Sequence, residues 1–277
     1  MTLPGLAPSM LEPASLKELD LRQSPAEFAE GVSLAPLEKS QARIEDAQRQ
    51  LWASRSAGVL LVFHGLDASG KDSTLRRLTQ AMDPMGVRVK GFGVPTEEEA
   101  THDFLWRAWP HLPARGEVVI FNRSYYEAVF AERVLAGNSE QAADGQSWPQ
   151  RYRAIREMEQ HLAGSGTCIL KFWLQVSAGE QRKRLLKRVN NGDKHWKFSP
   201  ADVHSLEQRD HYLQTASTMI AETHDERAPW HLVPADDKEL ARRAVAERVA
   251  GVLEAIVGPW PEADAELLAH YRERLQD

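Results

Sequence analysis

A short apolar run that ends in a glycine-rich turn is the feature that most constrains the fold of this chain. The run covers Gly58–Phe63 and does not alternate with polar residues, which is typical of a strand buried on both faces. A G-x-x-x-x-G-K pattern follows it, and a helical pattern over 73–82 comes next. In this context the pattern predicts a phosphate-binding loop, whose backbone N–H groups point at phosphate oxygens. A glycine turn with a purely structural role is the alternative. We expect phosphate contacts from Gly65, Ala68, Ser69, Gly70, Lys71, Asp72 and Ser73.

The same succession of short apolar runs and helical patterns continues along the chain. Further strands are expected at 87–94, 118–121, 169–176 and 230–233. Helical patterns cover 37–54, 97–108, 124–135, 149–163, 179–190, 202–223 and 237–257. This alternation predicts an α/β fold with a five-stranded parallel sheet covered by helices on both faces. Ligands of such sheets bind beyond the carboxyl ends of the strands.

The net negative charge of the chain comes from its two ends. The formal net charge is −6, which taken alone argues against a polyanionic partner. Residues 1–50 hold 5 basic and 8 acidic side chains, residues 259–277 hold 2 and 5, and residues 51–258 hold 27 of each. The central region is therefore neutral. We divide the chain into an N-terminal arm (1–35), one domain (36–257) and a C-terminal tail (258–277).

Compartment and redox chemistry are constrained by what the sequence lacks. The lone Cys168 lies in an apolar run and is expected to be a small buried side chain. No signal peptide and no apolar run of about 20 residues is apparent, so a cytoplasmic location is expected.

Two acidic residues belong to the predicted phosphate loop. Asp72 stands where such loops usually carry the Ser or Thr that binds Mg²⁺, so it either holds a metal through water or caps the following helix. Asp67 would be repelled by phosphate unless it binds a metal or takes a proton from the acceptor, a turn-forming role being the alternative.

The third predicted strand is followed by Asn122, Arg123 and, four residues after Arg123, Glu127. Arg123 would face the same crevice as the loop, where a guanidinium can bridge donor and acceptor phosphates. Glu127 could pair with Arg123 or bind the metal or the acceptor, while a surface Arg–Glu pair is the alternative.

Residues 182–197 carry seven basic side chains and one acidic one. Arg184 and Arg188 share a helix face, and Lys194 and Lys197 follow in a stretch without helical pattern. Ser199 and Pro200 predict the start of the next helix. We expect residues 182–202 to form a helical lid that covers phosphate, although a solvated cationic face is the alternative.

These motifs resemble those of the polyphosphate kinase 2 family. The similarity lies in Gly-Leu-Asp-Ala-Ser-Gly-Lys-Asp, Asn-Arg-Ser-Tyr-Tyr-Glu and Lys-His-Trp-Lys-Phe-Ser-Pro-Ala-Asp, and it extends over about residues 30–257. The resemblance implies a P-loop kinase fold similar to thymidylate kinase. It also implies reversible phosphoryl transfer between inorganic polyphosphate and nucleotides with Mg²⁺, Mn²⁺ being an alternative metal. Homo-oligomers, as dimers or tetramers, are implied as well, with neither nucleic acid nor membrane as a partner.

Residue roles follow from the same resemblance. Asp67, Lys71, Arg123 and Glu127 would be catalytic, with Asp67 also binding the metal. Arg123, Arg184, Arg188, Lys194 and Lys197 would bind polyphosphate. Asp67, Asn122, Arg123 and Glu127 would bind the nucleotide, and the Asn122–Glu127 version of the motif resembles the subgroup that accepts both mono- and diphosphates. An ATP-dependent nucleoside monophosphate kinase and a non-catalytic phosphate-binding regulatory protein are the two alternatives.

Overall fold

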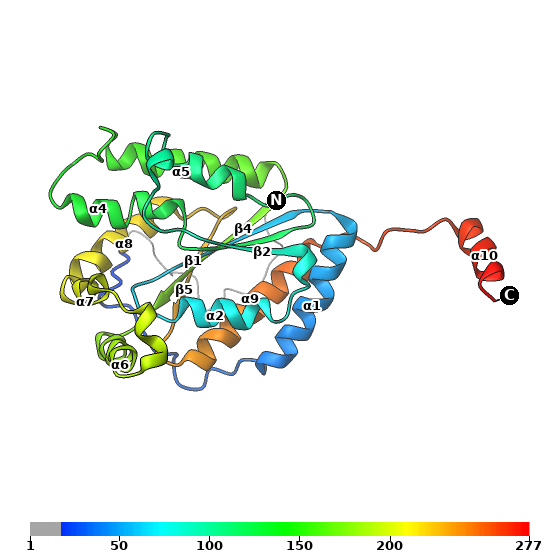
Figure 1. The fold of residues 1–277 in the computed structure, drawn as a ribbon, viewed down its shortest axis with the longest axis horizontal. Helices are drawn as coiled ribbons and strands as arrows, with labels where there is room; N and C mark the ends of the chain where they lie inside the picture. The colour runs from blue at the N-terminus through cyan, green and yellow to red at the C-terminus, as the bar shows by residue number, and fades with distance from the viewer. Residues whose placement is uncertain (1–17, 277) are drawn as a thin grey trace.

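A five-stranded, all-parallel sheet forms the centre of the molecule (Figure 1). The computed structural model describes residues 18–276. The strand order is β2-β3-β1-β4-β5, which places the strand before the phosphate loop in the middle. This confirms the predicted α/β fold. The strands are β1 (Gly58–His64), β2 (Val87–Gly91), β3 (Val118–Asn122), β4 (Thr167–Gln175) and β5 (Trp230–Pro234).

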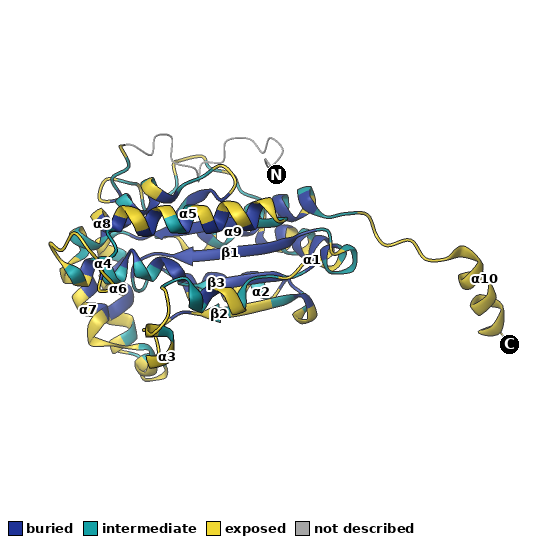
Figure 2. Ribbon diagram, turned by 90° about the horizontal axis from the view of Figure 1, so that it is seen from above, coloured by how far each residue is buried: buried dark blue, intermediate teal, exposed yellow. Residues whose placement is uncertain are grey.

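Helices cover both faces of the sheet, as the apolar strands predict (Figure 2). Alternate residues of β1 enter opposite cores: Leu61 packs on one side and Leu60 and Val62 on the other. One core is closed by α1 (Leu37–Ser54), α2 (Lys71–Thr79) and α9 (Lys238–Ile256). The other is closed by α5 (Trp148–Gly164) and α8 (Arg209–Thr223).

Three helices that we expected to be continuous are interrupted. The first, 97–108, consists of α3 (Glu97–Ala100) and the 3-10 helix η2 (Trp106–His111), because the Asp103 side chain accepts from Leu105 N and favours a turn between them. The segment 124–135 consists of η3 (Tyr125–Ala128) and α4 (Ala131–Ala136), and 202–223 breaks at Gln208. The predicted strand at 87–94 ends at Gly91.

Of the remaining elements, η1 precedes β2 at the amino edge of the sheet, α6, η4 and α7 follow β4 at the carboxyl edge, and α10 lies near the C-terminus. Ser199 is the N-cap of α7 and Pro200 its first residue, as predicted, and the structure adds a capping box between Ser199 and Asp202. In Figure 1, α10 lies apart from the sheet. These elements are η1 (Pro84–Gly86), α6 (Ala178–Val189), η4 (Gly192–Lys197), α7 (Pro200–Glu207) and α10 (Ala265–Arg274).

The proposed N-terminal arm lies partly outside the described residues, which begin at residue 18. Its described part is anchored, because Leu21 is fully buried and its backbone N–H donates to Ser217 Oγ at 2.9 Å. Cys168 is half-buried beside one core, and burial raises the pKa of its thiol to about 12. Within residues 18–276, no helix has the length and apolar content needed to cross a bilayer.

Candidate active site

The loop between β1 and α2 has a backbone that its glycines make possible. Gly65 and Gly70 have φ angles of 142° and 109°, and Ala68 also has a positive φ of 62°. A Cβ on Gly65 would lie 2.7 Å from the Leu174 carbonyl oxygen and 2.8 Å from Ser69 Oγ. Any larger residue would therefore have to displace backbone at this position. Ser73 Oγ donates to the Gly70 carbonyl at 2.9 Å and closes the first turn of α2.

Lys71 is the first residue of α2 and is only 8% exposed. Its ammonium group curls back over the loop and donates to the carbonyls of Gly65 at 2.6 Å and Leu66 at 3.0 Å. Burial lowers the pKa of Lys71 to about 8, even though nearby carboxylates, Asp67 foremost, oppose the shift. The group is therefore still mainly a cation at neutral pH, and it lies at the centre of the loop.

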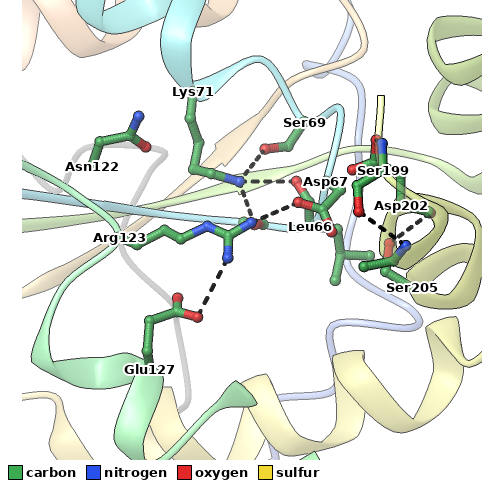
Figure 3. A network of polar contacts seen from close by, with 12 residues as sticks. Leu66, Asp67, Ser69, Lys71, Asn122, Arg123, Glu127, Ser199, Asp202 and Ser205 are labelled. Atoms are coloured by element: carbon green, nitrogen blue, oxygen red, sulfur yellow. Dashed lines mark hydrogen bonds and ion pairs between the residues drawn. The ribbon is translucent and has the colours of Figure 1, made fainter. Parts of the chain in front are cut away.

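Arg123 reaches the same crevice from the end of β3 (Figure 3). Phe63 pairs with Asn122 in the β1–β3 ladder, which places Arg123 beside the loop. The backbone N–H of Arg123 donates to the Phe63 carbonyl at 3.0 Å. Its guanidinium contacts Asp67 Oδ1 at 2.8 Å and Glu127 Oε2 at 3.6 Å. Its φ of 61° lies in the left-handed region, so the extended backbone of β3 does not continue through Arg123. The structure thus brings together Asp67, Lys71, Arg123 and Glu127.

Glu127 and the buried His64 lie next to each other on the buried side of these four residues. Burial raises the pKa of Glu127, although the neighbouring cations Arg123 and Lys71 oppose the shift. His64 Nδ1 lies 3.5 Å from Glu127 Oε1, and His64 Nε2 lies 2.9 Å from Ser124 Oγ. Burial lowers the pKa of His64 well below its usual value, so the imidazole is neutral. Sequence reasoning missed His64, although a histidine at the end of an apolar strand beside Gly65 was a usable signal.

Asp72 connects the loop to η4, a contact that the sequence did not predict. Its Oδ1 accepts from Asn122 Nδ2 at 3.0 Å and its Oδ2 pairs with Lys197 Nζ at 2.9 Å. Burial acts to raise its pKa, but these two partners outweigh burial and the pKa of Asp72 is lowered. Both oxygens are thus engaged by side chains from other elements.

Arg184 has a position that differs from the one we expected. It is only 9% exposed, and its guanidinium donates to carbonyls of the phosphate loop, Ala68 at 3.1 Å and Ser69 at 2.9 Å. It also donates to Ala235 at 2.7 Å and Asp236 at 2.9 Å. Arg184 therefore supports the loop from behind in this structure, and its contact with phosphate stays a prediction.

The predicted lid is built from short helices joined by ion pairs. Arg188 Nη1 donates to Asp202 Oδ2 at 2.7 Å and to the Lys197 carbonyl at 3.2 Å. Asp202 also accepts from Ser199 N at 3.1 Å, so one buried carboxylate connects α6 with the start of α7. Lys194 is half-buried; its backbone N–H donates to the Asn191 carbonyl at 2.8 Å, whereas its ammonium group forms no hydrogen bond or ion pair with the residues that the structure describes. Residues 192–197, where we expected no regular structure, form η4.

A second charged cluster lies inside the domain, behind the Arg123 segment. Lys171 and Glu159 are 0% and 1% exposed and form an ion pair at 2.6 Å. Glu159 Oε1 accepts from the hydroxyls of Tyr125 at 2.6 Å and Tyr126 at 2.9 Å. Lys171 also donates to the Thr223 carbonyl at 2.8 Å. The network fixes the two tyrosines that follow the Arg123–Ser124 turn.

The carboxylates of the site fit one mode of Mg²⁺ binding. No group of three or more metal-ligating side chains occurs within residues 18–276. However, Mg²⁺ commonly binds through one or two carboxylates together with substrate phosphates and water. Asp67 is partly exposed, and its Oδ2 accepts no hydrogen bond from the described residues, so this oxygen is available as a ligand. Asp67 therefore suits a metal that is shared with a phosphate substrate.

Comparisons with known proteins agree with this geometry. The family model for polyphosphate kinase 2 (PPK2) matches residues 30–257. An ADP-polyphosphate phosphotransferase from Rhodopseudomonas palustris is 43% identical over 227 residues, covering 79% of this chain and 78% of that protein. An AMP/ADP-polyphosphate phosphotransferase from Meiothermus ruber is 41% identical over 222 residues, covering 80% and 81%.

A solved structure extends the likeness to the fold. The crystal structure of polyphosphate kinase 2 from Arthrobacter aurescens superposes with a TM-score of 0.88 at 33% identity and covers 100% of both chains. The matched region contains the phosphate loop, the Arg123 segment and the lid, which are the parts that form the crevice described above. This chain belongs to the polyphosphate kinase 2 family.

Proposed function

We propose that this chain transfers a phosphoryl group between inorganic polyphosphate and nucleoside mono- and diphosphates, reversibly and with Mg²⁺. The observation that carries the proposal is the position of Arg123, which lies between Asp67 and Glu127 at the same strand edge as Lys71. The relative from R. palustris is named as a phosphotransferase of ADP and polyphosphate, and the relative from M. ruber as one of AMP or ADP and polyphosphate, which supports the proposal.

The reaction needs little covalent chemistry from the protein. A phosphate oxygen of the nucleotide forms a new P–O bond to the terminal phosphorus of polyphosphate, and the bridging P–O bond to the rest of the chain breaks. Charge on the transferred group then spreads over its outer oxygens. Lys71 and Arg123 would stabilise those oxygens, and the N–H groups of the loop would hold the phosphate in place.

The carboxylates divide between metal and nucleotide. Asp67 would hold Mg²⁺, or Mn²⁺, through its unengaged oxygen, and the metal supplies charge neutralisation between the two phosphate substrates. Glu127 would act at the nucleotide side by orienting Arg123, since it pairs with the opposite nitrogen of the guanidinium. Asn122 would contribute to the same side as a neutral amide. Asp72 and Lys197 would separate when phosphate competes for the lysine.

The lid would bring Lys194 and Lys197 over the polyphosphate chain and exclude water from the transferred group. Arg188 connects η4 to α7, since it donates to the Lys197 carbonyl and to Asp202. It would therefore position the lid over the phosphate loop, and it would itself contact polyphosphate. We further propose that the protein works in the cytoplasm as a homo-oligomer, a dimer or a tetramer, which size-exclusion chromatography with light scattering would test.

An initial-rate panel tests the activity. AMP, ADP, GMP and GDP are each supplied with long-chain polyphosphate or with ATP as the sole phosphoryl donor, in the presence of Mg²⁺. We expect nucleotide phosphorylation from polyphosphate and, in the reverse direction, polyphosphate formation from nucleoside triphosphate. Good ATP-driven phosphorylation of AMP with none from polyphosphate would instead identify an ATP-dependent kinase. Absence of turnover with every pair would leave a phosphate-binding protein without catalysis.

A further inference from the structure

The face of α6 that points away from the phosphate loop contains a cationic groove. The groove has a volume of about 580 Å³, and none of the side chains that line it is acidic. Three basic side chains and two amides contribute, together with the exposed Leu186. These polar lining residues are Arg182, Lys183, Lys187, Asn190 and Asn191.

The charges of this groove are poorly neutralised by the protein. Arg182 and Lys187 form no ion pair within residues 18–276, and the pair of Lys183 with Glu180 at 3.2 Å involves a lysine side chain that is 79% exposed. Lys183 and Lys187 are also spaced i,i+4, where like charges destabilise a helix. By contrast, the two inward-facing arginines of α6 are engaged by carboxylates and carbonyls.

Positive charge continues from the groove toward the lid. The pKa of Lys238, at the start of α9, is lowered by burial and by the neighbouring positive charges of Arg184, Lys187 and Lys194, which together outweigh the opposing carboxylate of Glu180. The outer face of α6, the first residue of α9 and η4 thus share a field in which positive charge predominates. An extended polyanion that contacts several of these cations at once would relieve this repulsion.

We propose that the groove on α6 is a distal binding site for the internal phosphates of a long polyphosphate chain whose end lies at the phosphate loop. This inference rests on the function proposed above. One helix separates the two sites, because Arg184 on the inner face contacts Ala68 and Ser69 of the loop. A helix is about 10 Å across, so only a chain that passes around α6 can occupy both sites. The asparagines at the end of the helix would donate amide hydrogen bonds to phosphate oxygens.

The site therefore predicts selectivity for chain length. We compare the triple variant Arg182→Gln/Lys183→Gln/Lys187→Gln with wild type, using inorganic triphosphate and long-chain polyphosphate as donors to ADP. Glutamine has a helix propensity close to that of lysine and arginine, so α6 should persist, and circular dichroism checks this. The preference for long chains, measured as the ratio of kcat/KM for the two donors, should fall by on the order of tenfold.

A matched control separates a local site from a change in net charge. The variant Arg49→Gln/Arg153→Gln/Arg227→Gln also removes three exposed cations, from α1, from α5 and from the turn before β5. It should keep the wild-type ratio. An equal loss in this control, or an equal loss for triphosphate and long chains in the α6 variant, would overturn the distal site. A wild type that uses neither donor would instead refute the proposed function itself.

Discussion

Two clusters of charged side chains meet at the segment after β3, and they differ in how completely the protein satisfies them. In the inner cluster, Lys171 and Glu159 are fully buried and bonded to tyrosine hydroxyls and a carbonyl. In the outer cluster, Arg123 is 41% exposed, and Asp67 Oδ2 has no partner among the described residues. The inner cluster has no capacity left for a ligand, whereas the outer one can exchange its internal ion pairs for contacts with phosphate.

The comparison shows how one segment can be rigid on one side and reactive on the other. Burial raises the pKa values of Tyr125 and Tyr126 well above the usual range, so both hydroxyls stay protonated and donate to Glu159. These two residues directly follow the Arg123–Ser124 turn. The buried network therefore fixes the backbone next to Arg123 through Tyr125 and Tyr126. It uses none of the N–H donors of the Arg123 guanidinium.

Breaking the inner cluster should have the largest effect on the fold. Lys171→Met leaves Glu159 buried without its cation, which typically costs about 3–5 kcal/mol of unfolding free energy. Urea denaturation measures the change. Replacing both partners, as Lys171→Met/Glu159→Leu, should recover part of the loss, because no unpaired charge then remains. A single variant as stable as wild type would contradict the description of this cluster as a closed network.

Breaking the outer cluster should impair catalysis and leave the fold intact. Lys71→Ala removes a cation that we expect to stabilise the transferred phosphoryl group, so kcat should fall by about 10²–10³-fold. The thermal unfolding midpoint is measured in parallel and should change little. Activity within a few-fold of wild type would mean that the loop has been misinterpreted.

The pH dependence of kcat/KM tests the role of Lys71 in the outer cluster. The pKa of Lys71 is lowered to about 8, so the free enzyme loses this positive charge as the pH rises through that value. We expect kcat/KM to be constant below that pH and to fall above it, by about tenfold at one unit higher. Lys71→Arg, which stays charged at these pH values, should lack the decline in whatever activity it retains. A wild-type profile that stays flat to pH 10 would contradict this assignment.

The smallest effect is expected at the lid. Lys194→Ala/Lys197→Ala removes two partly exposed cations, one of which is paired with Asp72, and should raise KM for polyphosphate by about fivefold. The dependence of KM on salt concentration should also become shallower, because fewer charges contact the polyanion. An unchanged salt dependence would indicate that these lysines form only a solvated surface.

The strands and the loop were predictable because their signals are local. Gly58–Phe63 is apolar throughout, and the glycines that follow have the conformations that a phosphate loop requires. The helix breaks at Gln208 and within 97–108 were not predictable, because they depend on turns that compete with a plausible helical pattern. Local pattern gives the element type more reliably than its continuity.

The contacts of the charged residues required the structure. Arg184 and Arg188 share a helix face, as the spacing predicts, yet Arg184 contacts carbonyls of the loop and Arg188 contacts Asp202. Asp72 pairs with a lysine 125 residues away in the chain. His64 and its neighbour Glu127 come together only when β1 and β3 pair. Such partners are set by tertiary packing, which spacing along one helix cannot reveal.

Arg123, which lies in the outer cluster and borders the inner one, offers the most direct test that the outer cluster catalyses phosphoryl transfer from polyphosphate. We would measure the initial rate of ATP formation from ADP and long-chain polyphosphate with Mg²⁺, for wild type and for Arg123→Gln. The thermal unfolding midpoints of the two proteins should be equal. We expect clear turnover by wild type and a loss of about 10²-fold or more in the variant, because the cation that stabilises the transferred group is removed. Equal rates for the two proteins, or no ATP from wild type, would contradict this expectation.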